Sequence, residues 1–505
     1  MSEPAVTVAA SAEGIEPAPR SLAGILRHLG PGLITAGAIV GSGELVATTK
    51  TGAEAGFWLL WLIIVGCVIK IFAQVELGRY AMSSGKAALA ALDDMPGPRA
   101  AVNWMLWYWL IMFTVSLGQL GGIIGGVGQA MAICMPITGD YNRSLEEKTP
   151  VTSQQPKAAA GLAVPLADAD RRTRDDLYWA TIITVLTAAV LATGRYGLIQ
   201  NVSIVLVAGF TFVSIVNLFM LQSQPRWAIS AAEVGQGLSF RLPPLIGELA
   251  QSPIVTALAA FGIIGVGTNE LIAYPYWCLE KGYARAAGPR DDSPEWAERA
   301  RGWIRVMLWD ASICMVVYTF ATLVFYLLGA AVLHREGLNP SDSQMIVVLG
   351  RIYVPVFGVW AEWLFLLGAI AVLYSTFFAA NASHARVGAD AARVFGLARQ
   401  TEVIRRRWIR GLCVFFPTVS LLFYVVWPKP VTLILASGVM QGIMLPMLAG
   451  AALYFRYRRC DRRICPGRLW DALLWLSGAG LLITGLWSIW SGLVKLIPLL
   501  VSRFA

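Results

Sequence analysis

The chain contains a series of long, continuous apolar segments, and these constrain its fold more than any other feature. Most are about 20 residues or longer with few charges, the length that an α-helix needs to cross about 30 Å of hydrocarbon. Because the apolar runs are continuous rather than alternating, a closed β-barrel is excluded. We therefore predict an all-α polytopic membrane protein. Its eleven expected spans are 31–55, 57–80, 103–135, 177–194, 198–221, 251–280, 304–333, 355–383, 408–427, 431–455 and 469–498.

The composition agrees with this class. Hydrophobic residues make up 57% of the 505 residues and charged residues 14%, whereas soluble domains carry about 25% charged residues. The net charge of +9 does not indicate a nucleic-acid partner, because basic cytoplasmic loops give a membrane protein the same excess. The expected surroundings are a lipid bilayer, and a monomer is the expected state.

Lys and Arg are distributed unequally between the two sides of the predicted membrane. The segments on the side of the N-terminus hold 25 of them, and the short segments on the other side hold 7, with the long loop 136–176 left out. By the positive-inside rule the N-terminus is cytoplasmic, and an odd number of spans places the C-terminus outside. We expect the protein in a bacterial inner membrane.

Two heptads that lie five spans apart share a pattern. Residues 41–47 read Gly-Ser-Gly-Glu-Leu-Val-Ala, and residues 267–273 read Gly-Thr-Asn-Glu-Leu-Ile-Ala. Because five is odd, the second copy crosses the membrane in the opposite direction, as in transporters built from inverted repeats. This predicts a disordered cytoplasmic tail, a first repeat with a flexible external loop at 136–176, a second repeat, and an eleventh helix. Their ranges are 1–29, 30–221, 222–455 and 456–505.

Each heptad places a glutamate, Glu44 or Glu270, at membrane depth beside glycines that weaken a helix. An unwound stretch must line a cavity or be buried in protein, and its freed carbonyls can hold a cation. An acid at the bilayer centre costs about 2.5 kcal/mol or more, so the pair indicates a functional site. The alternative is that each glutamate only caps the following half-helix, where negative charge is favourable. Capping and cation binding are compatible.

Several segments resemble the Nramp (natural resistance-associated macrophage protein) family of divalent-metal transporters, which have a LeuT-like fold. Residues 30–61 look like the first helix of that family, residues 260–274 (AFGIIGVGTNELIAY) like the sixth, and residues 437–448 (SGVMQGIMLPML) like the tenth. The resemblance extends over roughly residues 22–450. It implies a five-plus-five inverted repeat with an extra helix, in which helices 1 and 6 are unwound at mid-membrane.

The metal-binding motifs of the family are altered in this chain. Its Asp-Pro-Gly-Asn motif falls on residues 41–44, so the carboxylate moves to the fourth position, Glu44. Its Met-Pro-His motif falls on residues 269–271. The resemblance implies a site at these two places, with two charged ligands and a shell of neutral oxygens. The implied ligands are Glu44, Glu270, Asn269, Ser42, Thr268 and the carbonyls of Gly41 and Val266.

The proton route of the family is also missing. The resemblance maps its titratable positions onto Gln119, Gly122 and Leu271, none of which carries a proton. We therefore expect passage that is driven by the membrane potential, worth about 2.3 kcal/mol per charge per 100 mV, and is not coupled to protons. The alternative, that the two glutamates carry protons themselves, stays open.

The expected substrate follows from the ligand chemistry. A site made only of oxygens suits a hard cation, and loss of the methionine sulfur removes the preference for softer metals. We expect a transporter of Mg²⁺ or Mn²⁺ by alternating access, in which the ion is cargo and no cofactor is needed. The alternatives are a transporter of a small organic solute, with the glutamates as proton or amine sites, and a transport-dead sensor.

Other residues point to no second chemistry. The sequence shows no nucleophile–base pair and no cofactor loop, so we do not expect an enzyme. Lys70 and Glu76 lie in the second span, where charges are expensive, but they are six residues apart and do not share a helix face. Their role is left open by the sequence.

Overall fold

The computed structural model describes residues 14–30, 41–147, 173–194, 197–244, 253–398 and 401–504. Four predicted segments lie partly outside these ranges: the tail 1–29, the first span 31–55, the loop 136–176 and the first two residues of the sixth span 251–280. The predictions for their missing parts therefore stay predictions.

The described chain is built from helices, apart from one short antiparallel hairpin in which Arg99 pairs with Asn103. The elements before the sixth span are α1 (Leu22–His28), η1 (Gly43–Thr48), α3 (Thr49–Ala55), α4 (Leu60–Val68), α5 (Lys70–Ser84), α6 (Ala88–Asp93), β1 (Arg99–Ala100), β2 (Val102–Asn103), α7 (Trp104–Cys134), α8 (Asp140–Glu147), α9 (Asp175–Thr193), α10 (Gly197–Leu221) and α11 (Ala231–Gly237). The later ones are α12 (Pro253–Ile263), α13 (Thr268–Lys281), α14 (Tyr283–Ala287), α15 (Pro294–Leu328), η4 (Gly329–His334), η5 (Asp342–Gln344), α16 (Met345–Gly350), η6 (Arg351–Tyr353), α17 (Val354–Phe357), η7 (Gly358–Trp360), α18 (Ala361–Val394), α19 (Glu402–Val426), α20 (Pro430–Tyr454), η8 (Phe455–Arg459), η9 (Arg462–Ile464) and α21 (Arg468–Phe504).

Nine helical segments within the described ranges are long and apolar enough to cross a membrane. They correspond to the predicted spans 2 to 4 and 6 to 11. Of the other two predicted spans, 31–55 is only partly described, and 198–221 contains the shorter apolar helix Val205–Leu221. The prediction of an all-α polytopic membrane protein is confirmed.

Several helices extend beyond the predicted spans, because their polar ends are also helical. The helix α15 begins at Pro294, ten residues before the predicted limit of 304, and the Ser293 hydroxyl caps it by accepting a hydrogen bond from the Trp296 amide. The helix α18 continues from 383 to Val394. The loop 136–176, predicted to be flexible, contains the helix α8 in its described part.

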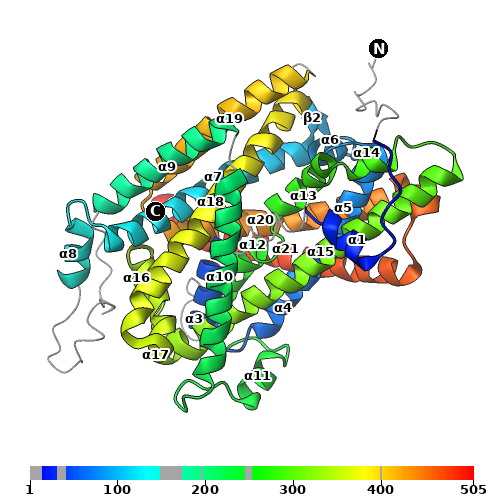
Figure 1. Cartoon of the computed structure of the whole chain (residues 1–505). Coiled ribbons are helices and arrows are strands. Elements are labelled where there is room, and N and C mark those ends of the chain that lie inside the picture. The colour runs from blue at the N-terminus through cyan, green and yellow to red at the C-terminus, as the bar shows by residue number, and fades with distance from the viewer. Residues whose placement is uncertain are drawn as a thin grey trace.

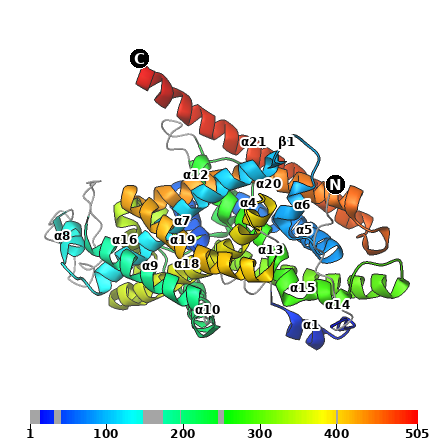
Figure 2. The ribbon, with the colours of Figure 1, turned by 90° about the horizontal axis from the view of Figure 1, so that it is seen from above.

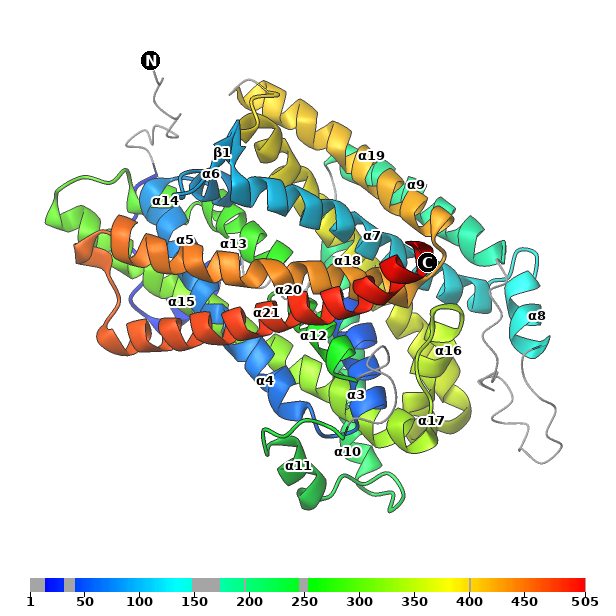
Figure 3. The same cartoon turned by 180° about the vertical axis from the view of Figure 1, so that it is seen from behind.

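The helices form one intertwined bundle in which segments far apart in sequence are neighbours. The short helix α3 lies beside α12 near the centre of the molecule, with α15 packed against both α3 and α4 (Figure 1). The helices α20 and α21 run side by side, and α12 and α7 both pack on α20 (Figure 3). The pair α9 and α19 covers one side of α7 (Figure 2).

Two glycines, Gly262 and Gly438, let the helices α12 and α20 approach closely. A Cβ atom on Gly262 of α12 would lie 1.9 Å from the carbonyl oxygen of Gly438 on α20, and a Cβ atom on Gly438 would lie 2.2 Å from the carbonyl of Ala259. Side chains at these positions would separate the helices. The glycines therefore let the sixth and tenth spans approach backbone to backbone, as small residues do in membrane helix pairs.

Candidate functional site

The sixth span is broken at its middle, as predicted. The helix α12 ends at Ile263 and α13 begins at Thr268, so Ile264 to Gly267 are not helical. Within the break Gly265 has a φ of +58°, a left-handed conformation that glycine adopts without steric cost. This confirms that the sixth helix is unwound. The glycines in the sequence, which weaken a helix, correctly predicted this break.

The carboxylate of Glu44 joins the start of the described first span to the break in the sixth span. Its Oε2 accepts a hydrogen bond from the Gly41 amide at 3.2 Å, and its Oε1 accepts one from the Gly265 amide at 3.1 Å. The Thr322 hydroxyl of α15 also donates to Oε1, at 3.4 Å. Glu44 is fully buried. It therefore holds the start of the described first span against the break in the sixth.

The first span is irregular around Glu44. Residues Gly43–Thr48 form the π-helical segment η1, and regular α-helix follows only from Thr49 to Ala55. π-Helical turns are rare in proteins, and those that occur are frequently located at functional sites. The residues before Gly41 lie outside the described ranges.

Glu270 borders the same break from the other side. It is the third residue of α13 and is half-buried. Its Oε2 lies over Gly267, where a Cβ atom would be only 2.5 Å away. The N-terminus of a half-helix favours negative charge at this place. The structure thus brings both predicted acids to one break.

A network of neutral polar side chains lies next to the two acids, and Gln119 of α7 is its centre. The Gln119 Oε1 accepts hydrogen bonds from the Ser437 hydroxyl and the Gln441 amide, each at 2.9 Å. Its Nε2 donates to the Ser42 hydroxyl at 3.4 Å. Gln119 therefore connects spans 1, 3 and 10.

The remaining predicted ligands join this network through the sixth span. The Thr268 hydroxyl donates to the backbone carbonyl of Gln441 at 2.8 Å. The Asn269 backbone amide donates to the side-chain Oε1 of Gln441 at 3.3 Å. The Asn269 side chain donates to the Ser116 hydroxyl at 2.9 Å. These side chains bind one another in the structure, so their assignment as cation ligands stays a prediction.

The other predicted positions are packed rather than hydrogen bonded through side chains. Val266 is buried inside the break. Gly41 lies against α18, where a Cβ atom would overlap the Thr376 hydroxyl at 1.8 Å. A Cβ atom on Gly122 would lie only 2.5 Å from the Pro430 carbonyl oxygen. Leu271 is fully buried.

Sequence reasoning missed how Lys70 and Glu76 are used. The Lys70 ammonium donates hydrogen bonds to carbonyls at the end of α12, and Glu76 forms an ion pair with Arg79 and accepts a hydrogen bond from the Trp470 indole at 2.7 Å. The partners of both charges come from other segments of the fold or from one turn along α5. A charge in an apolar span was the signal, but it did not reveal the partner.

Among the described residues, no group of three or more His, Cys, Asp and Glu side chains forms a metal cluster. A cation bound here would be held by the two acids, Glu44 and Glu270, together with amide, hydroxyl and carbonyl oxygens. Such donors suit hard cations that keep part of their water shell.

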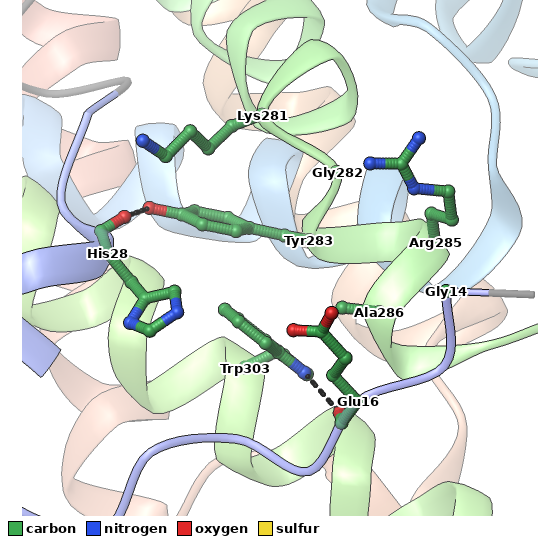
Figure 4. Close-up of a pocket in the computed structure, with 9 residues that line it drawn as sticks. All are labelled: Gly14, Glu16, His28, Lys281, Gly282, Tyr283, Arg285, Ala286 and Trp303. Atoms are coloured by element: carbon green, nitrogen blue, oxygen red, sulfur yellow. Dashed lines mark hydrogen bonds between the residues drawn. The ribbon is translucent and has the colours of Figure 1, made fainter. Parts of the chain in front are cut away.

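A separate hollow of about 120 Å³ lies at the far end of α13, where the N-terminal segment crosses α14 and α15 (Figure 4). The Trp303 indole donates to the Glu16 carbonyl at 3.0 Å, and the Tyr283 hydroxyl donates to the His28 carbonyl at 2.7 Å. Lys281, which lines the hollow, is eleven residues from Glu270, or about 16 Å along the helix. This hollow is therefore distinct from the break.

Comparison with known proteins places these features in a family. The family described as natural resistance-associated macrophage protein-like matches residues 173–491, which is more than half of the chain. The metal transporter Nramp6.2 of Populus trichocarpa is 32% identical over 100 residues, which cover 20% of this chain and 18% of that protein.

Solved structures show the same fold at low sequence identity. A mutant of the Eremococcus coleocola manganese transporter matches with a TM-score of 0.63 and 15% identity, over 94% of this chain and 88% of that one. MhsT in complex with L-phenylalanine matches with a TM-score of 0.51 and 13% identity, over 95% of this chain and all of that one. The fold is therefore LeuT-like. By the extent of the family match, the chain belongs to the natural resistance-associated macrophage protein (Nramp) family.

Proposed function

We propose that this integral membrane protein moves a hard divalent cation across the bilayer by alternating access, with Glu44 and Glu270 as its charged ligands. One observation carries the proposal: the buried Glu44 and the half-buried Glu270 both lie at the same helix break. Two carboxylates neutralise one divalent ion. The names of the similar proteins, a metal transporter and a manganese transporter, support a metal as cargo.

The neutral groups around the acids favour Mg²⁺ or Mn²⁺. The position of the family's methionine sulfur is held by Asn269, whose amide lies in a network of oxygen and nitrogen groups. Hard cations prefer oxygen ligands, and Mg²⁺ is usually bound with several of its waters. A site with two acids and several hydroxyl or amide groups at hydrogen-bonding range fits a partly hydrated ion.

We further propose that transport is not coupled to protons. Gln119 and Leu271 replace titratable groups, and Gln119 is already engaged by Ser42, Ser437 and Gln441. A neutral network of this kind has no group that changes charge near pH 7. The membrane potential, negative inside, then drives the cation inward.

Flux into proteoliposomes tests the proposal. Purified protein is reconstituted, a potassium diffusion potential is set negative inside, and uptake of Mn²⁺ and Mg²⁺ is followed together with a pH-sensitive dye in the lumen. We expect cation uptake without acidification, and none for Glu270→Gln. Uptake accompanied by acidification contradicts the uncoupled mechanism, and absence of uptake contradicts cation transport.

A second candidate is transport of a small organic solute. The amide and hydroxyl groups of Gln119, Gln441 and Ser437 form a wall of neutral hydrogen-bonding groups beside the two acids. Such a wall also suits an amine with polar substituents. Competition separates the candidates: a cation transporter is inhibited by other divalent ions, whereas an organic-solute transporter is inhibited by amines and unaffected by divalent ions.

A further inference from the structure

Lys70 is fully buried at the start of α5, close to the break in the sixth span. An ammonium group inside a membrane protein needs strong partners, because burial removes its water. The two nearby acids do not supply them by direct contact: the ammonium is hydrogen bonded to main-chain carbonyls instead.

The partners of Lys70 are freed by the helix break. Its Nζ donates to the carbonyls of Phe261 and Ile264, the latter at 2.8 Å, and lies 4.9 Å from the centre of the Phe261 ring. In a continuous helix the Gly265 amide and the Phe261 carbonyl would bond to each other. Here the amide donates to Glu44, and the carbonyl accepts from Lys70.

This arrangement has the chemistry of a monovalent-cation site. Carbonyls at the C-terminal end of a half-helix carry partial negative charge, and unwound carbonyls in transporters coordinate small cations. The face of an aromatic ring adds attraction for the same charge. Here two carbonyls and the Phe261 ring surround an ammonium that is covalently attached to the protein.

We propose that Lys70 fills a built-in monovalent-cation site at the end of α12, so that the chain carries its own cation where a broken helix otherwise binds a free one. With Lys70 in place, the two carbonyls and the Phe261 ring already hold a cation next to the break. The inference goes beyond the proposed function, because it does not depend on which solute is transported.

Two substitutions test this site. Lys70→Ala removes the ammonium and leaves its space, whereas the control Lys70→Met removes the charge but fills the space with an apolar chain of similar length. We expect both variants to melt at a lower temperature than the wild type. Methylammonium chloride should raise the melting temperature of Lys70→Ala only. Tetramethylammonium chloride at equal ionic strength, which cannot donate N–H hydrogen bonds, should have no effect.

At a methylammonium concentration ten times its Kd, the ratio of folded to unfolded Lys70→Ala should rise about tenfold. An equal response of Lys70→Met, or no response of Lys70→Ala, overturns the proposal.

A measurement on the wild type decides the matter if Lys70→Ala does not fold. Replacing all Na⁺ and K⁺ by N-methylglucamine should leave the melting temperature of the wild type unchanged, because its site is already filled. Stabilisation of the wild type by Na⁺ or K⁺, relative to N-methylglucamine at equal ionic strength, overturns the proposal. Failure of divalent-cation binding, by contrast, leaves this result intact.

Discussion

At the scale of single residues, the two glutamates of the repeat have different surroundings. Glu44 is fully buried and accepts hydrogen bonds from two backbone amides and a threonine hydroxyl, whereas Glu270 is half-buried over Gly267. These hydrogen bonds give Glu44 a structural role, and its role as a cation ligand stays a prediction. Glu270 is the acid with more freedom to meet a cation.

This difference predicts unequal effects on stability. Glu44→Gln removes the charge and turns an amide NH₂ toward backbone donors, so it loses charge-assisted hydrogen bonds worth about 1.5–3 kcal/mol each. We expect a clearly lower melting temperature for Glu44→Gln and a nearly unchanged one for Glu270→Gln. Equal melting temperatures of the two variants in detergent would show that Glu44 does not hold the first span against the break in the sixth.

Sequence reasoning identified the acids but not their partners. Glu44 and Glu270 stand out because an acid in an apolar span is expensive. Lys70 and Gln119 lie near the same break, but their partners are in place only once the sixth helix breaks and spans 1, 2, 3 and 10 pack together. A contact that depends on tertiary packing leaves no periodic pattern in the sequence.

At the scale of elements, the break in the sixth span depends on Gly265. A side chain there would be held at a φ of +58°, which costs roughly 1–2 kcal/mol, and its Cβ would lie 2.9 Å from the Tyr318 ring. We expect Gly265→Ala to destabilise the protein and abolish flux in proteoliposomes. The control is Gly209→Ala in α10, where nothing lies within 4 Å of the added Cβ and alanine favours the helix. Comparable flux of the two variants would contradict the role of the break.

The connection between α20 and α21 depends on pH through Asp461. Its carboxylate accepts hydrogen bonds from the Arg463 amide and guanidinium and pairs with Arg290 at 3.0 Å. Hydrogen bonding to Arg463 lowers the pKa of Asp461 from 3.8 to about 2. A depressed pKa stabilises the folded state above pH 3.8 and loses that contribution as the pH falls toward 2.

Asp461→Asn should therefore melt below the wild type at pH 7, and the difference should shrink between pH 4 and pH 2. The control is Asp292→Asn, which changes an exposed acid of the neighbouring loop. A melting difference for Asp461→Asn that is independent of pH would contradict this account.

Element boundaries were the least predictable part of the fold. The apolar runs located the spans, but α15 and α18 continue past them because their ends are capped or amphipathic rather than apolar. The helix α8 has no apolar run to reveal it. Hydropathy reports where a helix meets lipid, and it does not report where the helix ends.

At the scale of the whole molecule, the fold was predictable because two local patterns agree. The long apolar spans define a helical bundle, and the pair of heptads at 41–47 and 267–273 defines repeats of opposite direction. The assignment of repeat boundaries at 221 and 455 stays a prediction.

The same topology predicts the location of the termini. With 25 Lys and Arg on one side against 7 in the short segments of the other, the N-terminus should be cytoplasmic and the C-terminus external. Protease added to intact spheroplasts should remove a C-terminal tag and spare an N-terminal one. Protection of both tags, or removal of the N-terminal tag alone, would contradict this orientation.

The central claim is that the two acids form one cation site, and calorimetry tests it most directly. Purified wild type is titrated with Mn²⁺, Mg²⁺ and Ca²⁺, beside Glu270→Gln and the control Glu362→Gln, which changes an acid in the first turn of α18. We expect wild type and control to bind a divalent ion at millimolar concentration or below, and Glu270→Gln to bind at least about tenfold more weakly, or about 1.4 kcal/mol. Absence of divalent binding to the wild type, or equal binding by Glu270→Gln, would contradict the claim.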